Sequence, residues 1–536
     1  MGLYVLLTVG CSGAPAPEPD AEVPGVRVQP LEGAALYRRI SLDLRGALPT
    51  DAELDRAEAG EVDPLVDELF ADPRLEARLT DLLGERWLTR VDRFPLDGDV
   101  FGYQGEEDAA FRDAIGEEPV RLAARIVADD RPWSEVVTGD TTMVEETLAA
   151  IWPVAYPEGA SGWQEVRWTD GRPALGVLGT NGFWWRYDTS QGNLNRHRAS
   201  ALAQFLLCED YLSRPVAVAA LDPALAESVE ELVHVSPGCL GCHASLDPLA
   251  SALFGFWWLD GTSEQELVVY HPEREHLGAY YLDAEPAWYG TPVEPAELGA
   301  AVAADDRFGR CAVQTWAELL WRRPVDPDDF TVIAALEADL GEVGFTGHAL
   351  LRAVLETEAY RAGALGPGAT AADAERTRTR RMMSDLLYAS VLADLTGFQW
   401  RESGIAVLQD DEAGYRVLAG GVDGRTVTRP LFEPGLTRAA TLERLAEAAA
   451  SHAVTEGQAG RGRLVDAAVL ATRPGDDAFR AALSGLRRRA TGALPEAAVL
   501  DDDAAMWTAI EAVDGADAAW TATLAVIFRD PAFGVY

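Results

Sequence analysis

Apolar residues recur at helical spacing along most of the chain. Side chains three and four positions apart share one face of a helix, so such runs predict amphipathic helices. Three runs carry the pattern: Leu65, Leu69, Leu75, Leu79, Leu82 and Leu83, then Phe308, Ala312, Trp316 and Leu320, and finally Met383, Leu387, Val391 and Leu395. We therefore predict a mainly α-helical, multi-domain protein with few short strands.

Cap and turn residues mark where several elements begin. Thr50 precedes the sequence Asp-Ala-Glu-Leu and is predicted to be a helix N-cap. Asp222-Pro223 and Asp247-Pro248 each place an aspartate cap before a proline in the first helical turn. Residues 133–150 are predicted to form a loop and a helix, and residues 422–425 (Val-Asp-Gly-Arg) a hairpin turn.

Length and local composition divide the chain into segments. At roughly 100–200 residues per domain, 536 residues correspond to three or four domains. Residues 363–370 are rich in Gly, Ala and Pro and are predicted to be a linker. We expect a signal and disordered tether at 1–26, a helical domain at 27–160, a central domain at 161–300, a helical domain at 301–362 and a mainly helical C-terminal domain at 371–536.

The charge balance is strongly acidic. The 87 acidic residues outnumber the 45 basic ones, giving a formal net charge of −42. Binding to nucleic acid needs clustered cations, so this composition argues against nucleic acid as a partner. No uncharged apolar run reaches the ~18 residues that span a bilayer, and we expect the body of the chain to be soluble.

The N-terminus resembles a bacterial lipoprotein signal. Residues 1–9 are short and apolar, Gly10-Cys11 follows, and residues 12–20 are rich in Pro and Ala. The pattern departs from the usual one because it has no basic start and has Thr8 where leucine is common. A plain cleaved signal or a frayed terminus is the alternative. We expect export to the periplasm, with Cys11 lipidated and anchored in the outer membrane.

The segment with the clearest chemistry is Cys239-Leu-Gly-Cys242-His243. C-x-x-C-H is the attachment signature of c-type haem. Two thiols one helical turn apart add across the vinyl groups of haem, and the adjacent histidine becomes the proximal iron ligand. We expect one haem c per chain, in a central haem-c-type domain. A disulfide or redox pair and a metal site stay open as alternatives, although no second C-x-x-C supplies further zinc ligands.

Two cysteines remain once haem and lipid are assigned. Each stands alone: Cys208 follows Phe205-Leu206-Leu207, and Cys311 lies in Gly309-Arg310-Cys311-Ala312. In an oxidising compartment they are able to pair as a disulfide. The alternative is two buried free thiols.

The second axial ligand of the iron is open from sequence. His234 is the candidate nearest to the motif, and Met143 is the methionine that we weigh against it. Further candidates are His271, His276, Met382 and Met383. An iron with no second protein ligand is also compatible with the motif, but we expect a filled site with a histidine.

Several stretches together resemble the haem-c-associated domains of unknown function of planctomycetes and myxobacteria, a family of exported cytochrome-c-like proteins. The likeness lies in residues 38–50, 72–74, 85–88, 175–180, 195–198, 239–248, 308–311, 322–324, 380–384, 396–398 and 420–424. It implies covalent haem at Cys239, Cys242 and His243. The chain departs from the family where Leu249-Ala250 replaces a usual glycine, and it lacks the separate N-terminal cytochrome domain that many relatives carry.

Three functions follow as expectations. The first is electron transfer at the cell envelope, with the cytochrome c maturation machinery and an unidentified redox protein as partners. The second is a surface scaffold or carbohydrate-binding lipoprotein in which haem or a disulfide only staples the central domain. The third is a peroxidase-like haem enzyme, and the sequence does not decide whether the protein is an enzyme. The aromatic runs at residues 183–185 and 254–258 fit a haem crevice, a saccharide platform or simple core packing.

Overall fold

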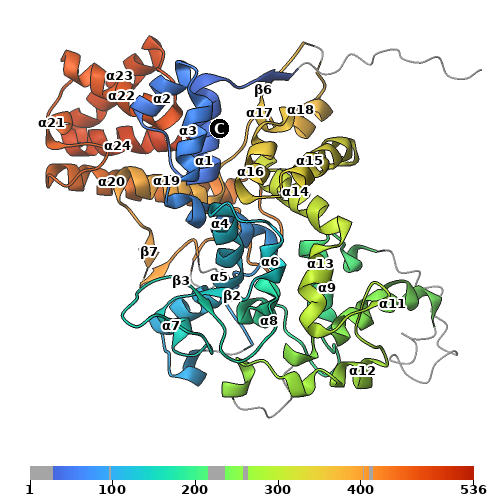
Figure 1. The fold of residues 1–536 in the computed structure, drawn as a ribbon. Coiled ribbons are helices and arrows are strands. Elements are labelled where there is room, and N and C mark those ends of the chain that lie inside the picture. Colours follow the sequence, from blue (N-terminus) through green and yellow to red (C-terminus); the bar gives the residue numbers. More distant parts are fainter. Residues whose placement is uncertain are drawn as a thin grey trace, which may run out of the picture.

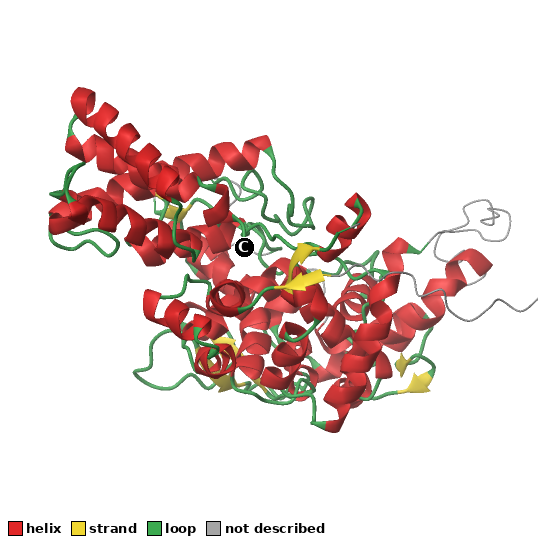
Figure 2. Cartoon of the chain, turned by 90° about the horizontal axis from the view of Figure 1, so that it is seen from above, coloured by secondary structure: helices red, strands yellow, loops and turns green. Residues whose placement is uncertain are grey.

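The computed structural model describes residues 28–95, 98–214, 236–256, 264–367, 369–402, 404–409 and 414–536. The chain is mainly α-helical, as predicted (Figures 1 and 2). In the described residues the strands form four two-stranded antiparallel sheets. The pairs are β1 (Val28–Pro30) with β6 (Ala362–Leu365), β2 (Thr141–Val144) with β3 (Gln164–Arg167), β4 (Ala287–Trp288) with β5 (Thr291–Pro292), and β7 (Arg401–Glu402) with β8 (Ile405–Ala406).

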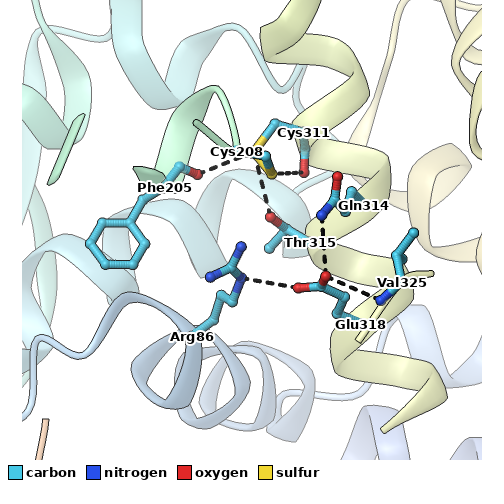
Figure 3. The surroundings of a disulfide bond; sticks show 8 residues. All are labelled: Arg86, Phe205, Cys208, Cys311, Gln314, Thr315, Glu318 and Val325. Atoms are coloured by element: carbon cyan, nitrogen blue, oxygen red, sulfur yellow. Dashed lines mark hydrogen bonds and ion pairs between the residues drawn. A yellow bond between two sulfur atoms is a disulfide. The ribbon is translucent and has the colours of Figure 1, made fainter. Parts of the chain in front are cut away.

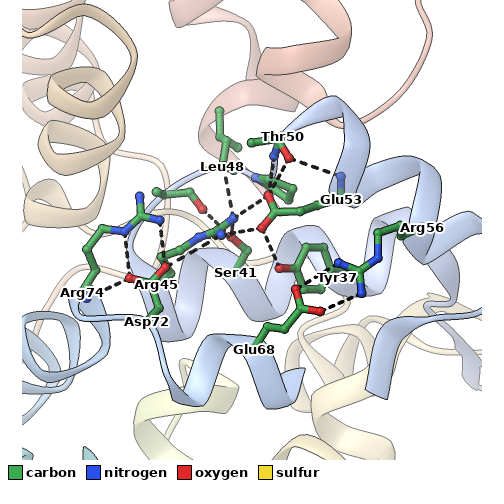
Figure 4. Close-up of polar contacts among 12 residues, drawn as sticks. Tyr37, Ser41, Arg45, Leu48, Thr50, Glu53, Arg56, Glu68, Asp72 and Arg74 are labelled. Atoms are coloured by element: carbon green, nitrogen blue, oxygen red, sulfur yellow. Dashed lines mark hydrogen bonds and ion pairs between the residues drawn. The ribbon is translucent and has the colours of Figure 1, made fainter. Parts of the chain in front are cut away.

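The N-terminal helices pack as a compact group around long apolar faces. Thr50 caps α2 as predicted: its side chain accepts from the backbone of Glu53, and the Glu53 carboxylate accepts from the backbone of Thr50. Arg45 at the end of α1 donates to the same carboxylate at 2.7 Å, which ties α1 to α2 (Figure 4). The helices are α1 (Gly33–Arg45), α2 (Asp51–Glu58), α3 (Val62–Phe70), α4 (Arg74–Trp87) and α5 (Glu106–Ala128).

The middle of the chain adds shorter helices to the same core. One hydrophobic cluster runs from Leu36 to Tyr360 and draws on all three segments that the sequence divides at 160 and 300. The α-helices are α6 (Glu135–Thr138), α7 (Glu146–Ala149), α8 (Asn181–Arg186), α9 (Arg196–Leu206), α11 (Pro237–Ser251), α12 (Leu277–Leu282), α13 (Leu298–Ala303), α14 (Asp306–Trp321), α15 (Phe330–Glu342), α16 (Gly347–Leu355) and α17 (Glu358–Arg361). Short 3-10 helices are η1 (Gly98–Phe101), η2 (Gly176–Gly179), η3 (Tyr211–Ser213), η6 (Phe254–Phe256), η7 (Glu264–Leu267), η8 (Pro272–Arg274), η9 (Pro295–Glu297) and η10 (Pro327–Asp329).

The C-terminal helices build a second core beside α1 (Figure 1). Leu42 and Leu48 from the N-terminal part belong to this second core. The buried Asp43 of α1 also joins the parts, because the hydroxyls of Tyr360 and Tyr536 both donate to its carboxylate. The helices are α18 (Ala371–Thr377), α19 (Asp385–Thr396), α20 (Leu436–Gln458), α21 (Ala467–Leu470), α22 (Asp477–Thr491), α23 (Ala497–Asp514), α24 (Ala516–Arg529) and α25 (Pro531–Gly534).

Three local predictions differ from the structure. Residues 133–150 contain α6, the strand β2 and α7 rather than a loop and one helix. The predicted linker at 363–370 begins inside β6, because its residues pair with β1. Residues 422–425 do not join two strands; the Asp423 carboxylate accepts backbone N–H groups of residues 425–427 and so closes a turn within the chain.

Candidate functional site

The C-x-x-C-H motif occupies the first two turns of α11. Pro237 is the first helical residue, where its fixed φ and missing N–H cost nothing. Positions i, i+3 and i+4 share one face of a helix, so the spacing brings Cys239, Cys242 and His243 together on α11. Both cysteines are free thiols, and they and His243 are partly exposed. The three side chains that the motif predicts to act together therefore share one accessible helix face.

The predicted cap at Asp247 serves another purpose. α11 continues through Asp247 and Pro248 to Ser251 instead of beginning again there. Asp247 lies one turn after His243, and its Oδ1 accepts a hydrogen bond from His243 Nδ1 at 2.9 Å. The carboxylate is buried, with 4% of its side chain exposed. The expectation of a new helix start at this position is thus wrong, because the aspartate side chain is engaged by the histidine.

Asp247 is itself held from a second helix. Arg196 at the start of α9 donates to both of its carboxylate oxygens, at 2.7 and 3.0 Å. Burial acts to raise the pKa of Asp247, but the hydrogen bonds from His243 and Arg196 together hold it below its usual value. The group is therefore a carboxylate with a fixed orientation. It is the acceptor that fixes the imidazole ring of His243.

This arrangement fits the chemistry of a c-type haem. The attachment needs two free thiols and one imidazole on the same helix. Histidines that bind metals commonly donate one ring N–H to a carboxylate, which fixes the tautomer and leaves the other nitrogen for the metal. His243 Nδ1 bonds to Asp247, and within the described residues its Nε2 has no hydrogen-bond partner. No group of three or more His, Cys, Asp or Glu side chains suited to a metal ion occurs in the described part of the chain.

The segment between α9 and α11 supports the motif helix. The hydroxyls of Tyr211 and Ser245 lie 2.8 Å apart, and Ser245 donates to the backbone carbonyl of Cys242. Arg214 donates to the carbonyl of Gly241 at 3.1 Å, and its guanidinium stacks on the ring of Tyr211. These contacts fix the backbone of α11 around the second cysteine.

Cys208 and Cys311 form a disulfide in the structure (Figure 3). It joins Cys208, two residues after the C-terminal end of α9, to α14 across 103 positions of sequence. The alternative of two buried free thiols therefore does not describe this pair. Since Tyr211 follows Cys208 by three residues, the disulfide also restrains the segment that contacts α11.

The candidates for the second axial position are scattered. Met143 is 2% exposed in β2 and belongs to the large core, and β2 and α11 lie apart in Figure 1. Both ring nitrogens of His271 are engaged, one by Glu273 and the other by the carbonyl of Glu266. Met383 is buried in the C-terminal core, with Met382 beside it in sequence. His276 is exposed and precedes α12. His234 lies outside the described residues, as does the predicted lipidation site Cys11. No hydrogen bond or ring contact joins His243 to any of the described candidates.

The first aromatic run packs in the interior. Phe183, Trp184 and Trp185 are 1–2% exposed, and the Trp184 indole donates to the carbonyl of Leu178. In the second run Phe254 is fully buried, while residues 257–258 lie outside the described part. The buried rings of Phe183, Trp184, Trp185 and Phe254 do not offer an open stacking surface, and core packing accounts for these four.

Four residues that support the motif have no role that the sequence pattern alone indicates. Arg196 lies in a stretch that resembles the family, and Tyr211, Arg214 and Ser245 belong to no recognisable motif. One signal was available: His243 and Asp247 are four positions apart, which is a hydrogen-bonding distance on a helix. Arg196 carries no such signal, because it reaches Asp247 from a helix 51 positions earlier.

No helix in the described part of the chain is both long and apolar enough to cross a membrane.

Residues 31–154 match the model of a family described as PSD4, a protein of unknown function (DUF1592). The matched part contains α1 to α7 and ends before the motif helix α11. Comparisons with curated proteins and with solved structures give no match.

Proposed function

We propose that this chain is an exported, single-haem c-type cytochrome that transfers electrons at the cell envelope. The observation that carries the proposal is the His243–Asp247 hydrogen bond, on a helix that also presents the free thiols of Cys239 and Cys242. A bound haem supplies one-electron redox chemistry. The residues of the chain supply the attachment of the haem, its orientation and the negative charge beside the histidine that would bind its iron.

Each residue of the site has a distinct part in this proposal. Cys239 and Cys242 would hold the haem through two thioether bonds, and His243 would ligate its iron through Nε2. Asp247 holds the imidazole ring through Nδ1 and raises its basicity as a ligand, because it is an anionic acceptor. Arg196 keeps Asp247 ionised and in place. The backbone contacts of Ser245 and Arg214 hold the helix turn that carries Cys242.

The proposed location is the outer membrane, through a lipid on Cys11. The apolar start followed by the Pro-rich tether supports it, and the resemblance to exported haem-c-associated proteins agrees with it. The net charge of −42 favours a redox partner with a positively charged docking surface.

Covalent haem is testable directly. The chain is produced in a host with an active cytochrome c maturation system, and its intact mass is measured after denaturation. We expect one haem adduct in the wild type and none in the double variant Cys239→Ser with Cys242→Ser. The matched control is Cys208→Ser with Cys311→Ser, which removes the other two described cysteines and keeps the adduct. A wild type at its bare polypeptide mass contradicts the proposal.

A further inference from the structure

A pocket gives access to one side of the Cys208–Cys311 disulfide. Its wall is formed by the C-terminal parts of α4, α9 and α14 and by the loop at residues 428–432. The volume is about 410 Å³, and pockets that bind small molecules commonly measure about 300–1,000 Å³. Cys208 lines the pocket and is partly exposed, whereas Cys311 is 1% exposed and does not contribute to the wall. A molecule in the pocket therefore meets the disulfide from the side of Cys208.

The wall of this pocket is rich in arginine although the chain as a whole is acidic. Four arginines and three acidic residues line it, in a chain whose formal net charge is −42. Arg322 pairs with Glu85 at 2.9 Å, and Arg323 pairs with Asp329 at 2.6 Å. Ion pairs within the fold therefore account for two of the four arginines.

The other two arginines keep donors for a ligand. Arg86 makes no hydrogen bond with the described residues, and its one ion pair is long, at 3.5 Å from Nε to Glu318 Oε2. Its side chain is 22% exposed, and its guanidinium points from α4 toward the disulfide (Figure 3). Arg429 is exposed on its loop and has no ion pair within the described part of the chain. Guanidinium groups bind carboxylates through paired N–H donors, so both residues suit an anionic ligand.

We propose that this pocket is a thiol–disulfide exchange site for a small thiol that carries carboxylate groups. The carboxylates bind to Arg86 and Arg429, and this places the sulfur of the thiol beside Cys208, which is the sulfur attacked. The side chains of Phe205 and Phe432 give the pocket apolar walls for the carbon atoms of the ligand.

The exchange conserves electrons and needs no further oxidant. The thiol gives up its proton, and the electron pair of its sulfur forms a bond to Cys208 Sγ while the Cys208–Cys311 bond breaks. Cys311 leaves with the electron pair of the broken bond and takes up a proton. Thr315 Oγ1 lies 4.0 Å from Cys311 Sγ, so its hydroxyl is placed to donate to the leaving sulfur (Figure 3). The products are a mixed disulfide on Cys208 and a free thiol at Cys311.

The charge of the whole chain makes this proposal distinguishable from simple access of thiols to an exposed disulfide. A net charge of −42 attracts cationic thiols and repels anionic ones at long range. Faster reaction of an anionic thiol therefore reports the arginines of the pocket and not the field of the whole protein.

The experiment compares three thiols of similar size on the full-length mature protein, without oxygen and at low ionic strength. The anionic thiol is 3-mercaptopropionate, the neutral one 2-mercaptoethanol and the cationic one 2-mercaptoethylamine. After an acid quench, peptide masses give the initial rate at which the disulfide is lost and the position of the adduct. Each rate is divided by the rate of the same thiol with bis(2-hydroxyethyl) disulfide, which removes differences in thiol reactivity. We expect the anionic thiol to react about fivefold faster than the cationic one, with the adduct on Cys208.

Arginine variants test whether the pocket causes this preference. Arg86→Gln and Arg429→Gln each reduce it, and the double variant is expected to abolish it. The matched control is Arg461→Gln, which removes an arginine that is 66% exposed just after α20 and leaves the preference unchanged. Far-UV circular dichroism verifies folding of each variant.

Three outcomes overturn the proposal: a cationic thiol that reacts as fast as the anionic one, an adduct on Cys311, or a preference that the double variant retains. None of them depends on haem attachment. Cys239 and Cys242 are free thiols, and a thiol forms no disulfide with another thiol unless an oxidant is present.

Discussion

His243 and Asp247 lie one turn apart on α11, with Nδ1 of the imidazole 2.9 Å from Oδ1 of the carboxylate. The same carboxylate accepts two hydrogen bonds from Arg196 on α9. The orientation of the imidazole is therefore set by two helices together. Because the acceptor is charged and buried, it also influences the electron density at the opposite ring nitrogen.

The first prediction concerns this charge. Asp247→Asn preserves the size of the side chain and weakens the charge-assisted bond to His243. The oxidised metal centre loses part of its stabilisation by the anion, so we expect the reduction potential to rise, on the order of 1 kcal/mol or roughly 40 mV. Redox titration of the purified holoprotein measures it. Haem content stays at one per chain, since the cysteines are unchanged.

A control separates this effect from a general disturbance of α11. Ser245→Ala removes a hydroxyl that bonds the Cys242 carbonyl and leaves the His243–Asp247 pair intact. Its potential is expected to match that of the wild type. Equal potentials in wild type and Asp247→Asn count against a role of the carboxylate in tuning the haem.

The second prediction concerns the disulfide. Cys208 and Cys311 are 103 positions apart, so the bond closes a long loop in the unfolded chain. We expect the double variant Cys208→Ser with Cys311→Ser to lower the free energy of unfolding by about 2–4 kcal/mol. Urea unfolding followed by tryptophan fluorescence measures the difference. Added reductant lowers the stability of the wild type and not that of the variant, and equal sensitivity of both proteins contradicts the assignment.

The helical pattern of the chain was predictable because it depends on local spacing. The apolar stripe at Phe308, Ala312, Trp316 and Leu320 is buried along α14. Thr50 caps α2 with the reciprocal bonds that its spacing to Glu53 allows. Both features involve residues within a few turns of each other, where geometry follows directly from sequence.

Features that depend on distant residues were not predictable. The Asp-Pro pair at 247–248 has the local form of a helix start, but His243 and Arg196 engage the aspartate, and α11 continues through the proline. The Gly, Ala and Pro content of residues 363–370 predicts a linker, but the range begins inside the strand β6, whose partner β1 lies more than 300 residues earlier. In both cases tertiary contacts override the local pattern.

The third prediction concerns pH. Glu118 is fully buried, and burial raises its pKa to about 7, although Gly182 and Thr142 donate hydrogen bonds to it. In the unfolded chain it ionises at about 4.5. Between these values the folded state holds a proton that the unfolded state has lost, so stability falls as pH rises from about 4.5 to about 7, by about 3 kcal/mol at most.

Glu118→Gln removes this contribution, because glutamine does not titrate; its amide oxygen accepts from Gly182 N–H, and its amide NH2 donates to the Thr142 hydroxyl. We expect the loss of stability between pH 4.5 and 7 to be smaller in the variant, as measured by urea unfolding at several pH values. Glu107→Gln, at an exposed position on the same helix α5, is the control and keeps the wild-type dependence. If the free energy of unfolding falls equally with pH in the wild type and in Glu118→Gln, Glu118 is not the source of the pH dependence.

The fourth prediction concerns the membrane anchor. If Cys11 is lipidated, cells grown with a fatty-acid probe label the wild type, and Cys11→Ser abolishes the labelling and releases the protein into the soluble envelope fraction. Two or three acyl chains anchor a protein firmly, whereas one binds weakly, so retention in the outer membrane is expected to be complete. Equal labelling of both proteins argues against this site.

The last prediction concerns the second face of the iron, because a filled position suits electron transfer and an open one suits peroxide chemistry. Met143 is buried in the main core, His271 uses both ring nitrogens, and Met383 packs in the C-terminal core. These surroundings disfavour all three as ligands, and His234 remains the candidate nearest to the motif in sequence.

We expect the ferric protein to have a six-coordinate, low-spin spectrum and to bind cyanide slowly. His234→Ala is expected to convert the spectrum to high-spin. Met143→Ala leaves the spectrum unchanged but lowers the free energy of unfolding by about 2–5 kcal/mol, because it opens a cavity in the core. A high-spin wild type that binds cyanide rapidly contradicts the electron-transfer proposal, and a spectrum that changes only in Met143→Ala assigns the ligand to methionine instead.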